Sequence, residues 1–138
     1  MNKQTTLTNY QLMSSLDALQ ALMMERMPAT TSILIDWNAE SVEKETKLIA
    51  KKQADLFREH AEWDEAADRP VISNGDVVWK SPEGRAEWEA LMQMETEIEF
   101  RPVDPNAFGQ ASAPPMVFRL LKWMFKDESA QEQVPAAA

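Results

Sequence analysis

The sequence predicts a mostly helical α+β domain, and two kinds of periodicity along the chain support that class. Apolar residues recur at helical spacing over residues 9–63, and they alternate with charged residues over 94–101. Between these segments, an asparagine-glycine pair lies among β-favouring residues, a pattern typical of a two-residue hairpin turn. The chain of 138 residues has the length of one domain. We expect that domain to span residues 1–126, with a flexible polar tail over 127–138.

An antiparallel helical hairpin is expected at the start of the domain. Thr8 is placed to cap a first helix over residues 9–27, and Pro28 should end it because proline disfavours helical geometry in the preceding residue. A second helix, capped by a hydroxyl group among residues 30–32, should run on to Trp63, since no proline or glycine interrupts it. The short connection between the two helices favours antiparallel packing.

The second helix carries an apolar stripe in which the residues are spaced by seven. Only one of the two seam positions of a coiled coil is apolar, so a two-stranded coiled coil is not expected. The helix is too long for the first helix to cover completely. We therefore expect part of the stripe to meet another chain. The stripe consists of Ile35, Val42, Ile49, Leu56 and Trp63.

Three short strands are expected to form one small antiparallel sheet. An acidic connector over residues 64–70 leads to two strands that flank Asn74 and Gly75, where a tight turn needs positive φ at both positions. The third strand, over 94–101, alternates apolar and charged side chains, as does a strand with one buried and one solvated face. Its charged face carries Glu95, Glu97, Glu99 and Arg101.

Two further helices should cover this sheet. Ser81 and Pro82 suit the cap and the first turn of a short helix, whose buried face would include Trp88. Pro115 is similarly placed to begin a C-terminal helix that ends near residue 125. This last helix is apolar on nearly every side, so we expect it to be buried on several sides or to form an interface. The aromatic residues that cannot share its apolar face are Phe118, Trp123 and Phe125.

The composition excludes several classes of function. A net charge of −9 argues against sequence-independent binding to nucleic acid and against docking on anionic lipid. The absence of cysteine excludes thiol chemistry, and three glycines cannot form a Walker loop or a dinucleotide fingerprint. Neither a signal peptide nor a membrane span is apparent. We expect a soluble protein that binds no cofactor.

Two clusters of titratable residues are candidate sites. The glutamates of the third strand could bind a hard cation or a basic peptide, but they also fit a solvated strand edge charged against aggregation. His60 and Asp64 lie at helical spacing with Glu59 adjacent, so they could ligate a metal, although a single histidine on a charged helix is more often simply exposed. We assign no catalytic residue and no metal ligand from these patterns.

The five tryptophans and nine methionines have three interpretations. Core packing accounts for most of them, and the remainder fits a protein interface. A stacking site for a nucleotide would need a basic groove, whereas Trp63 and Trp88 have acidic neighbours. The acidic surface suggests a separate possibility, mimicry of nucleic acid, although lysines interrupt that surface on the second helix.

The order of these parts resembles a family of small, mostly uncharacterised proteins from tailed bacteriophages and prophages. The resemblance covers about Leu7 to Phe125, and it includes three short patches: Asn-Gly-Asp-Val-Val-Trp, Ser-Pro-Glu-Gly and Glu-Ile-Glu-Phe. It implies a phage-encoded product that acts in an infected bacterial cell. The family provides no active-site residue to carry over to this chain.

The sequence thus predicts a non-enzymatic phage protein that acts through protein–protein interaction and self-assembly, as a virion or assembly accessory component. We expect it in the host cytoplasm or in the virion, as a homo-oligomer or bound to another phage or host protein, without direct contact to nucleic acid or membrane. The alternative is an inhibitor of a host enzyme or defence system, acting by acidic mimicry or ligand sequestration. The expected interface residues are Ile35, Val42, Ile49, Leu56, Phe118, Trp123 and Phe125.

Overall fold

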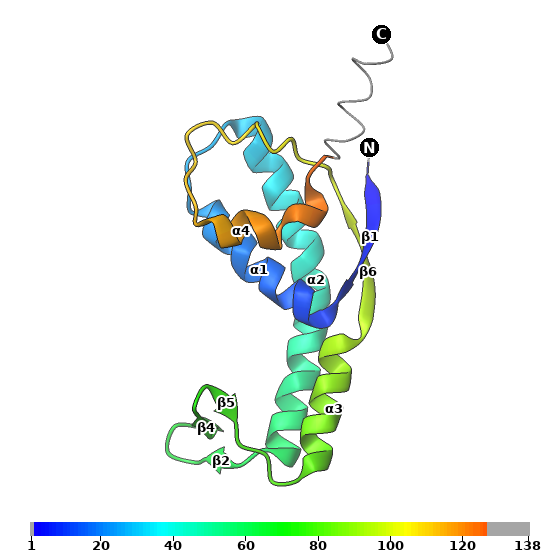
Figure 1. The fold of residues 1–138 in the computed structure, drawn as a ribbon, viewed down its shortest axis with the longest axis vertical. Helices are drawn as coiled ribbons and strands as arrows, with labels where there is room; N and C mark the ends of the chain where they lie inside the picture. The colour runs from blue at the N-terminus through cyan, green and yellow to red at the C-terminus, as the bar shows by residue number, and fades with distance from the viewer. Residues whose placement is uncertain (1, 127–138) are drawn as a thin grey trace.

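The protein is built along one long helix, α2 (Ala29–His60), in a computed structural model that describes residues 2–126 (Figure 1). Its 32 residues span about 48 Å. Helix α1 (Asn9–Met23) packs along its N-terminal half and α3 (Pro82–Gln93) along its C-terminal half. We call residues 50–93 the stalk and the rest of the described chain the head.

The expected helical hairpin is confirmed in part: α1 packs against α2, but the ends and the cap of these helices differ from the expectation. Helix α1 ends at Met23 rather than residue 27, because the chain needs residues 24–28 to reverse direction before α2. The capping hydroxyl expected among residues 30–32 is not used, since Pro28 occupies the cap position. The Thr31 hydroxyl instead donates a hydrogen bond to the Ala107 carbonyl over 2.6 Å and ties α2 to a distant loop.

Helix α2 also ends earlier than expected, at His60, and Trp63 lies in a short strand beyond it. The stalk half of α2 does not project freely, because α3 packs against it. Gly84 of α3 is buried there, and a Cβ at this position would overlap His60 and lie 2.9 Å from Trp79. The missing side chain lets the two helices approach closely.

Within residues 2–126, the strands form three separate two-stranded ladders, so the expected single three-stranded sheet is wrong. Strand β6 (Glu95–Phe100) pairs antiparallel with β1 (Lys3–Thr8), a strand the sequence did not predict. The expected hairpin, β4 (Ile72–Ser73) with β5 (Asp76–Val77), lies in the stalk, at the other end of α3 from β6. A third pair joins β2 (Trp63–Asp64) to β3 (Arg69–Pro70).

The burial pattern of β6 agrees with the predicted alternation. Ile98 and Phe100 are buried, while Glu95, Glu97 and Glu99 are exposed. The far edge of β6 is covered by two polar side chains of α2. Asn38, fully buried, accepts a 2.7 Å hydrogen bond from the Arg101 amide and donates to its carbonyl at 3.0 Å. Ser41 donates to the Glu99 carbonyl at 2.6 Å.

The C-terminal helix is shorter than expected, because it divides into α4 (Pro115–Leu120) and the 3₁₀ turn η1 (Lys122–Met124). Both lie across α1 in the head. The head core contains leucines from α1, the start of the apolar stripe of α2, and apolar residues of the segment from α4 to η1. Its fully buried members include Leu12, Leu19, Leu22, Ile35, Val42, Leu121 and Met124. No helix in the described part of the chain is long and apolar enough to cross a bilayer.

The β4–β5 turn is the two-residue type expected from the sequence. Asn74 and Gly75 have φ values of 53° and 82°, and they connect the paired residues Ser73 and Asp76. Because a Cβ on Gly75 would meet no atom within 4 Å, a substitution there acts through backbone conformation alone.

We expect Gly75→Ala to destabilise the hairpin by about 1 kcal/mol, the cost of a left-handed conformation for a residue with a Cβ. Amide exchange measures this locally, since the Val78 amide donates to the Val71 carbonyl across the base of the hairpin. Exchange at Val78 should become about fivefold faster. Asn74→Gly is the matched control and should leave the rate nearly unchanged. Equal exchange rates at Val78 in Gly75→Ala and in the parent protein would contradict the conclusion that the turn requires a left-handed conformation at Gly75.

Candidate functional site

A hollow of about 250 Å³ opens in the head between α1 and α4. It lies where the first turns of α1 face the end of α4 and the turn η1, beside the end of β1. We call it the α1–α4 hollow. Its lining residues are Leu7, Tyr10, Gln11, Ser14, Arg119, Leu120, Lys122 and Trp123.

The α1 side of the hollow is positioned by the cap of that helix. The Thr8 hydroxyl accepts from the Gln11 amide at 3.1 Å, and the Gln11 side chain accepts from the Thr8 amide at 2.9 Å. This reciprocal pair satisfies two backbone donors at the helix start. It fixes the first turn, where Tyr10 is 62% exposed at the rim of the hollow.

The α4 side of the hollow is anchored through Trp123. Its indole Nε1 donates to the hydroxyl of Ser15 at 2.9 Å, and Phe100 packs edge-on against the ring with centroids 5.5 Å apart. The buried Ser15 hydroxyl in turn donates to the Leu120 carbonyl at 3.4 Å. Two elements far apart in the sequence are thereby held together, and Trp123 has little freedom to turn away.

The hollow is locally basic on an acidic protein. Arg119 and Lys122 line it, and residues 105–126 contain three basic residues and no acidic one, although the chain carries a net charge of −9. Within residues 2–126, neither Arg119 nor Lys122 forms an ion pair. Tyrosine, tryptophan and arginine are also the residue types that contribute most binding energy at protein interfaces. The hollow therefore combines unpaired cations with aromatic and aliphatic surface.

The predicted interface on α2 needs a correction. Ile35, Val42 and Ile49 are 1%, 0% and 6% exposed, because they form part of the core within this one chain. These three residues need no second chain to cover them, so the prediction that they form an interface is wrong. The stripe seemed unpartnered because the sequence did not reveal that α1, α3 and β6 all pack against α2.

The remaining predicted interface residues are half-buried. Leu56 lies on the stalk half of α2, and Phe118 and Phe125 pack edge-on against Phe108 at centroid distances of 5.4 and 5.8 Å. Only Trp123 borders the hollow.

Sequence reasoning missed the other hollow residues, above all Tyr10, Arg119 and Lys122. The two basic residues, three apart in the segment predicted as the C-terminal helix, were a usable signal. Their location beside α1 was not visible in the sequence.

The other tryptophans pack within the chain. Trp88 donates to Gln53 at 3.0 Å, and its ring lies 6.3 Å from that of Trp79. The guanidinium groups of Arg58 and Arg101 lie 4.6 and 4.5 Å from the rings of Trp63 and Trp37. These contacts favour the packing interpretation over a nucleotide-stacking site.

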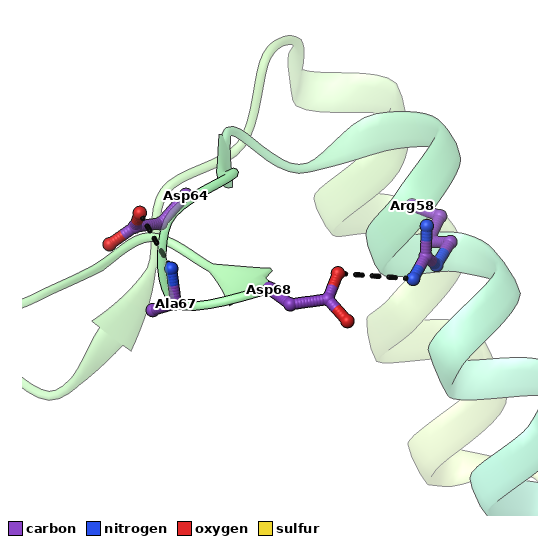
Figure 2. A network of polar contacts seen from close by, with 4 residues as sticks. All are labelled: Arg58, Asp64, Ala67 and Asp68. Atoms are coloured by element: carbon purple, nitrogen blue, oxygen red, sulfur yellow. Dashed lines mark hydrogen bonds and ion pairs between the residues drawn. The ribbon is translucent and has the colours of Figure 1, made fainter.

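The His60 group does not form the metal site that its spacing allowed. The His60 Nε2 lies 3.2 Å from a Glu87 carboxylate oxygen and 3.8 Å from one of Glu59. The Asp64 carboxylate instead accepts hydrogen bonds from backbone amides of its own loop, among them Ala67 at 3.2 Å (Figure 2). No group of three or more potential ligands gathers within residues 2–126.

One ion pair joins the acidic connector, residues 64–70, to the end of α2. The Arg58 guanidinium lies 3.4 Å from a carboxylate oxygen of Asp68, and both side chains are largely exposed (Figure 2). The pair contributes little stability, because solvent screens exposed charges. The β6 glutamates do not converge with this region, since they lie beyond the opposite end of α3.

Comparisons with protein-family models, with curated proteins and with solved structures gave no match for this chain. The resemblance to a phage family therefore stays a prediction from the sequence.

Proposed function

We propose that this chain is a non-enzymatic, protein-binding accessory of a tailed phage or prophage, and that it holds an acidic segment of its partner in the α1–α4 hollow. The observation that carries the proposal is a pair of cations, Arg119 and Lys122, that form no ion pair within residues 2–126 and lie beside Tyr10, Leu120 and Trp123. The setting is the cytoplasm of the infected cell, where the protein assists assembly.

The size and chemistry of the hollow support a protein segment as the occupant. A volume of about 250 Å³ is slightly below the 300–1,000 Å³ or so that is typical of small-molecule pockets. It suits a few side chains of a larger partner. The cations favour carboxylates, while Tyr10, Leu120 and Trp123 offer apolar contact. A segment that mixes acidic and aliphatic residues satisfies both requirements.

A charge reversal tests this proposal. The probe is a fluorescent synthetic peptide with the repeating sequence Glu-Thr-Leu-Thr, whose binding is followed by anisotropy. We expect the double variant Arg119→Glu, Lys122→Glu to weaken binding about a hundredfold, because two attractive contacts become repulsive. The matched control is Lys51→Glu, Lys52→Glu, which makes the same charge change at two exposed positions of α2.

Two results would contradict the proposal. One is an equal loss of affinity in the α2 control, which would indicate a nonspecific charge effect. The other is equally tight binding of a peptide with glutamine in place of glutamate, since the cations would then play no part. Circular dichroism of each variant checks that the fold is retained.

An inhibitor of a host enzyme or defence system is the second candidate. It is favoured by the exposed acidic face of β6, where Glu95, Glu97 and Glu99 stand in one row. Such a face could imitate the charge of nucleic acid. Location separates the candidates, because a virion or assembly component should co-purify with particles or their precursors. An inhibitor should be absent from them and be produced early in infection.

A further inference from the structure

Strand β1 has one edge bonded to β6, and no other strand within residues 2–126 pairs with its second edge, which we call the open edge. The Asn9 amide donates to the Met94 carbonyl at 2.9 Å, in register with the β1–β6 ladder. In an antiparallel ladder, the residues that exchange hydrogen bonds alternate with residues whose amides and carbonyls point away. The backbone groups of Leu7, Thr5 and Lys3 therefore face β6. Those of the alternate residues, Thr8, Thr6 and Gln4, point to the opposite edge.

Side-chain contacts on both strands agree with this parity. The Thr8 amide, which should point away from β6, is bonded to the Gln11 side chain. On β6, the Glu99 carbonyl points away from β1 and accepts from Ser41. Arg101 likewise directs its amide and carbonyl to Asn38. The outer edge of β6 is thus covered by α2, whereas Gln4 and Thr6 of β1 are exposed.

The open edge lacks the features that usually prevent strand addition. Natural edge strands are protected by proline, by charged side chains or by a covering element. Strand β1 contains no proline, and its single charge is at its first residue, Lys3. Three of its six residues are threonine, a β-favouring type. The edge can accept a further strand through the backbone groups of Gln4 and Thr6.

The α1–α4 hollow adjoins this same edge. The Thr8 amide points to the open side, and its partner Gln11 lines the hollow. Leu7, whose side chain is buried on the inner face of the sheet, borders the hollow as well. A strand added to β1 would therefore turn alternate side chains over the inner face and toward Arg119 and Lys122.

We infer that the partner segment binds in extended form, as a third strand on the open edge of β1, and places alternate acidic and aliphatic side chains in the hollow. This inference rests on the proposed function and specifies how the segment is held. Backbone hydrogen bonds supply affinity in this mode, and pockets for alternate side chains supply specificity.

The charges around β1 also restrict which side chains the partner segment can carry at the alternate positions that face away from the hollow. Residues that face outward would lie beside Gln4 and Thr6, in rows that continue to Glu99 and Glu97 on β6. Carboxylates on that face would be repelled. The segment should therefore carry acidic or aliphatic residues at one set of alternate positions and neutral or basic residues at the other.

N-methylated peptides test the binding mode without altering the protein. Two versions of the Glu-Thr-Leu-Thr peptide have identical side chains. One carries N-methyl groups on the threonines and the other on the glutamates and leucines. Only one set of amides can bond to β1, so we expect one version to bind at least tenfold more weakly and the other to retain its affinity. Loss with the threonine version indicates an antiparallel strand, and loss with the other version a parallel one.

A variant of the protein provides the second measurement. Thr6→Pro removes an amide that points to the open edge and leaves the ladder with β6 intact, so peptide affinity should fall about tenfold. Thr6→Val is the matched control, because it keeps the amide and the shape of the side chain. It measures what the side chain alone contributes, and Thr6→Pro should bind the peptide about tenfold more weakly than Thr6→Val.

The possible failures are distinguishable. If both methylated peptides bind equally but the Arg119→Glu, Lys122→Glu variant does not bind, strand addition is overturned and the proposed function stands. If the unmethylated peptide does not bind, or binds regardless of charge reversal, both proposals fall. If light scattering shows a dimer that Thr6→Pro dissociates, the edge belongs to a second copy, and the inference about a partner segment is overturned.

Discussion

Asn38→Leu is expected to lower the free energy of unfolding by about 2–5 kcal/mol. The side chain is fully buried and bonds to both backbone groups of Arg101, at 2.7 and 3.0 Å. Leucine has the same number of side-chain heavy atoms and the same branching at Cγ, but its side chain neither accepts nor donates a hydrogen bond. The amide and carbonyl of Arg101 would lose their partner in a water-poor location, which is costlier than the loss of an exposed hydrogen bond.

Urea unfolding of Asn38→Leu should show a lower midpoint with an unchanged slope. Glu40→Leu places the same side chain at an exposed position of α2 and should change stability by less than about 0.5 kcal/mol. Ser41→Ala, which removes one hydrogen bond at the same strand edge, should cost about 1 kcal/mol. If Asn38→Leu lowers the free energy of unfolding no more than Glu40→Leu does, the amide and carbonyl of Arg101 must form hydrogen bonds with water instead.

Gly84→Leu is expected to destabilise the stalk by about 3 kcal/mol. Even a Cβ would overlap His60 and lie 2.9 Å from Trp79, so a larger side chain must push α3 away from α2. That displacement would also disturb the neighbouring rings of Phe57, Trp79 and Trp88, which pack at centroid distances of 5.5 and 6.3 Å. The loss should exceed the helix-propensity gain of about 1 kcal/mol that replacing glycine brings.

Ala86→Leu is the matched control for Gly84→Leu, since it adds side-chain volume at an exposed position of the same helix. Thermal unfolding and near-ultraviolet circular dichroism of the tryptophans give the readouts. We expect a clear fall in the melting temperature for the Gly84 variant alone. A Gly84 variant as stable as the control would mean that α3 can slide on α2 without loss of packing.

Local signals in the sequence predicted the local parts of the fold. The cap at Thr8, the turn at Asn74 and Gly75, and the start of α3 at Pro82 are each determined by a few neighbouring residues. The alternation in β6 also identified which of its faces is buried. These features depend on backbone preferences and on side-chain periodicity, which remain visible without any tertiary contact.

Strand β1 could not be predicted, because its stability comes from a partner about 90 residues away in the chain. Only Leu7 among its six residues is a large apolar one, so the strand shows no alternation of its own. Its pairing with β6 is what brings Leu7 and Tyr10 near α4 and forms the hollow. For the same reason, the sequence identified Trp123 but not Arg119 or Lys122 as part of one site.

The division of α2 between two partners has a consequence for how the chain folds. The stalk is formed by residues 50–93, whose contacts join segments close together in the sequence. The head requires β1 to find β6 and α1 to find α4, contacts that span most of the described chain. Closing short loops costs less entropy than closing long ones. During synthesis, the stalk can therefore fold first and present a finished half of α2, on which the two ends of the chain later meet.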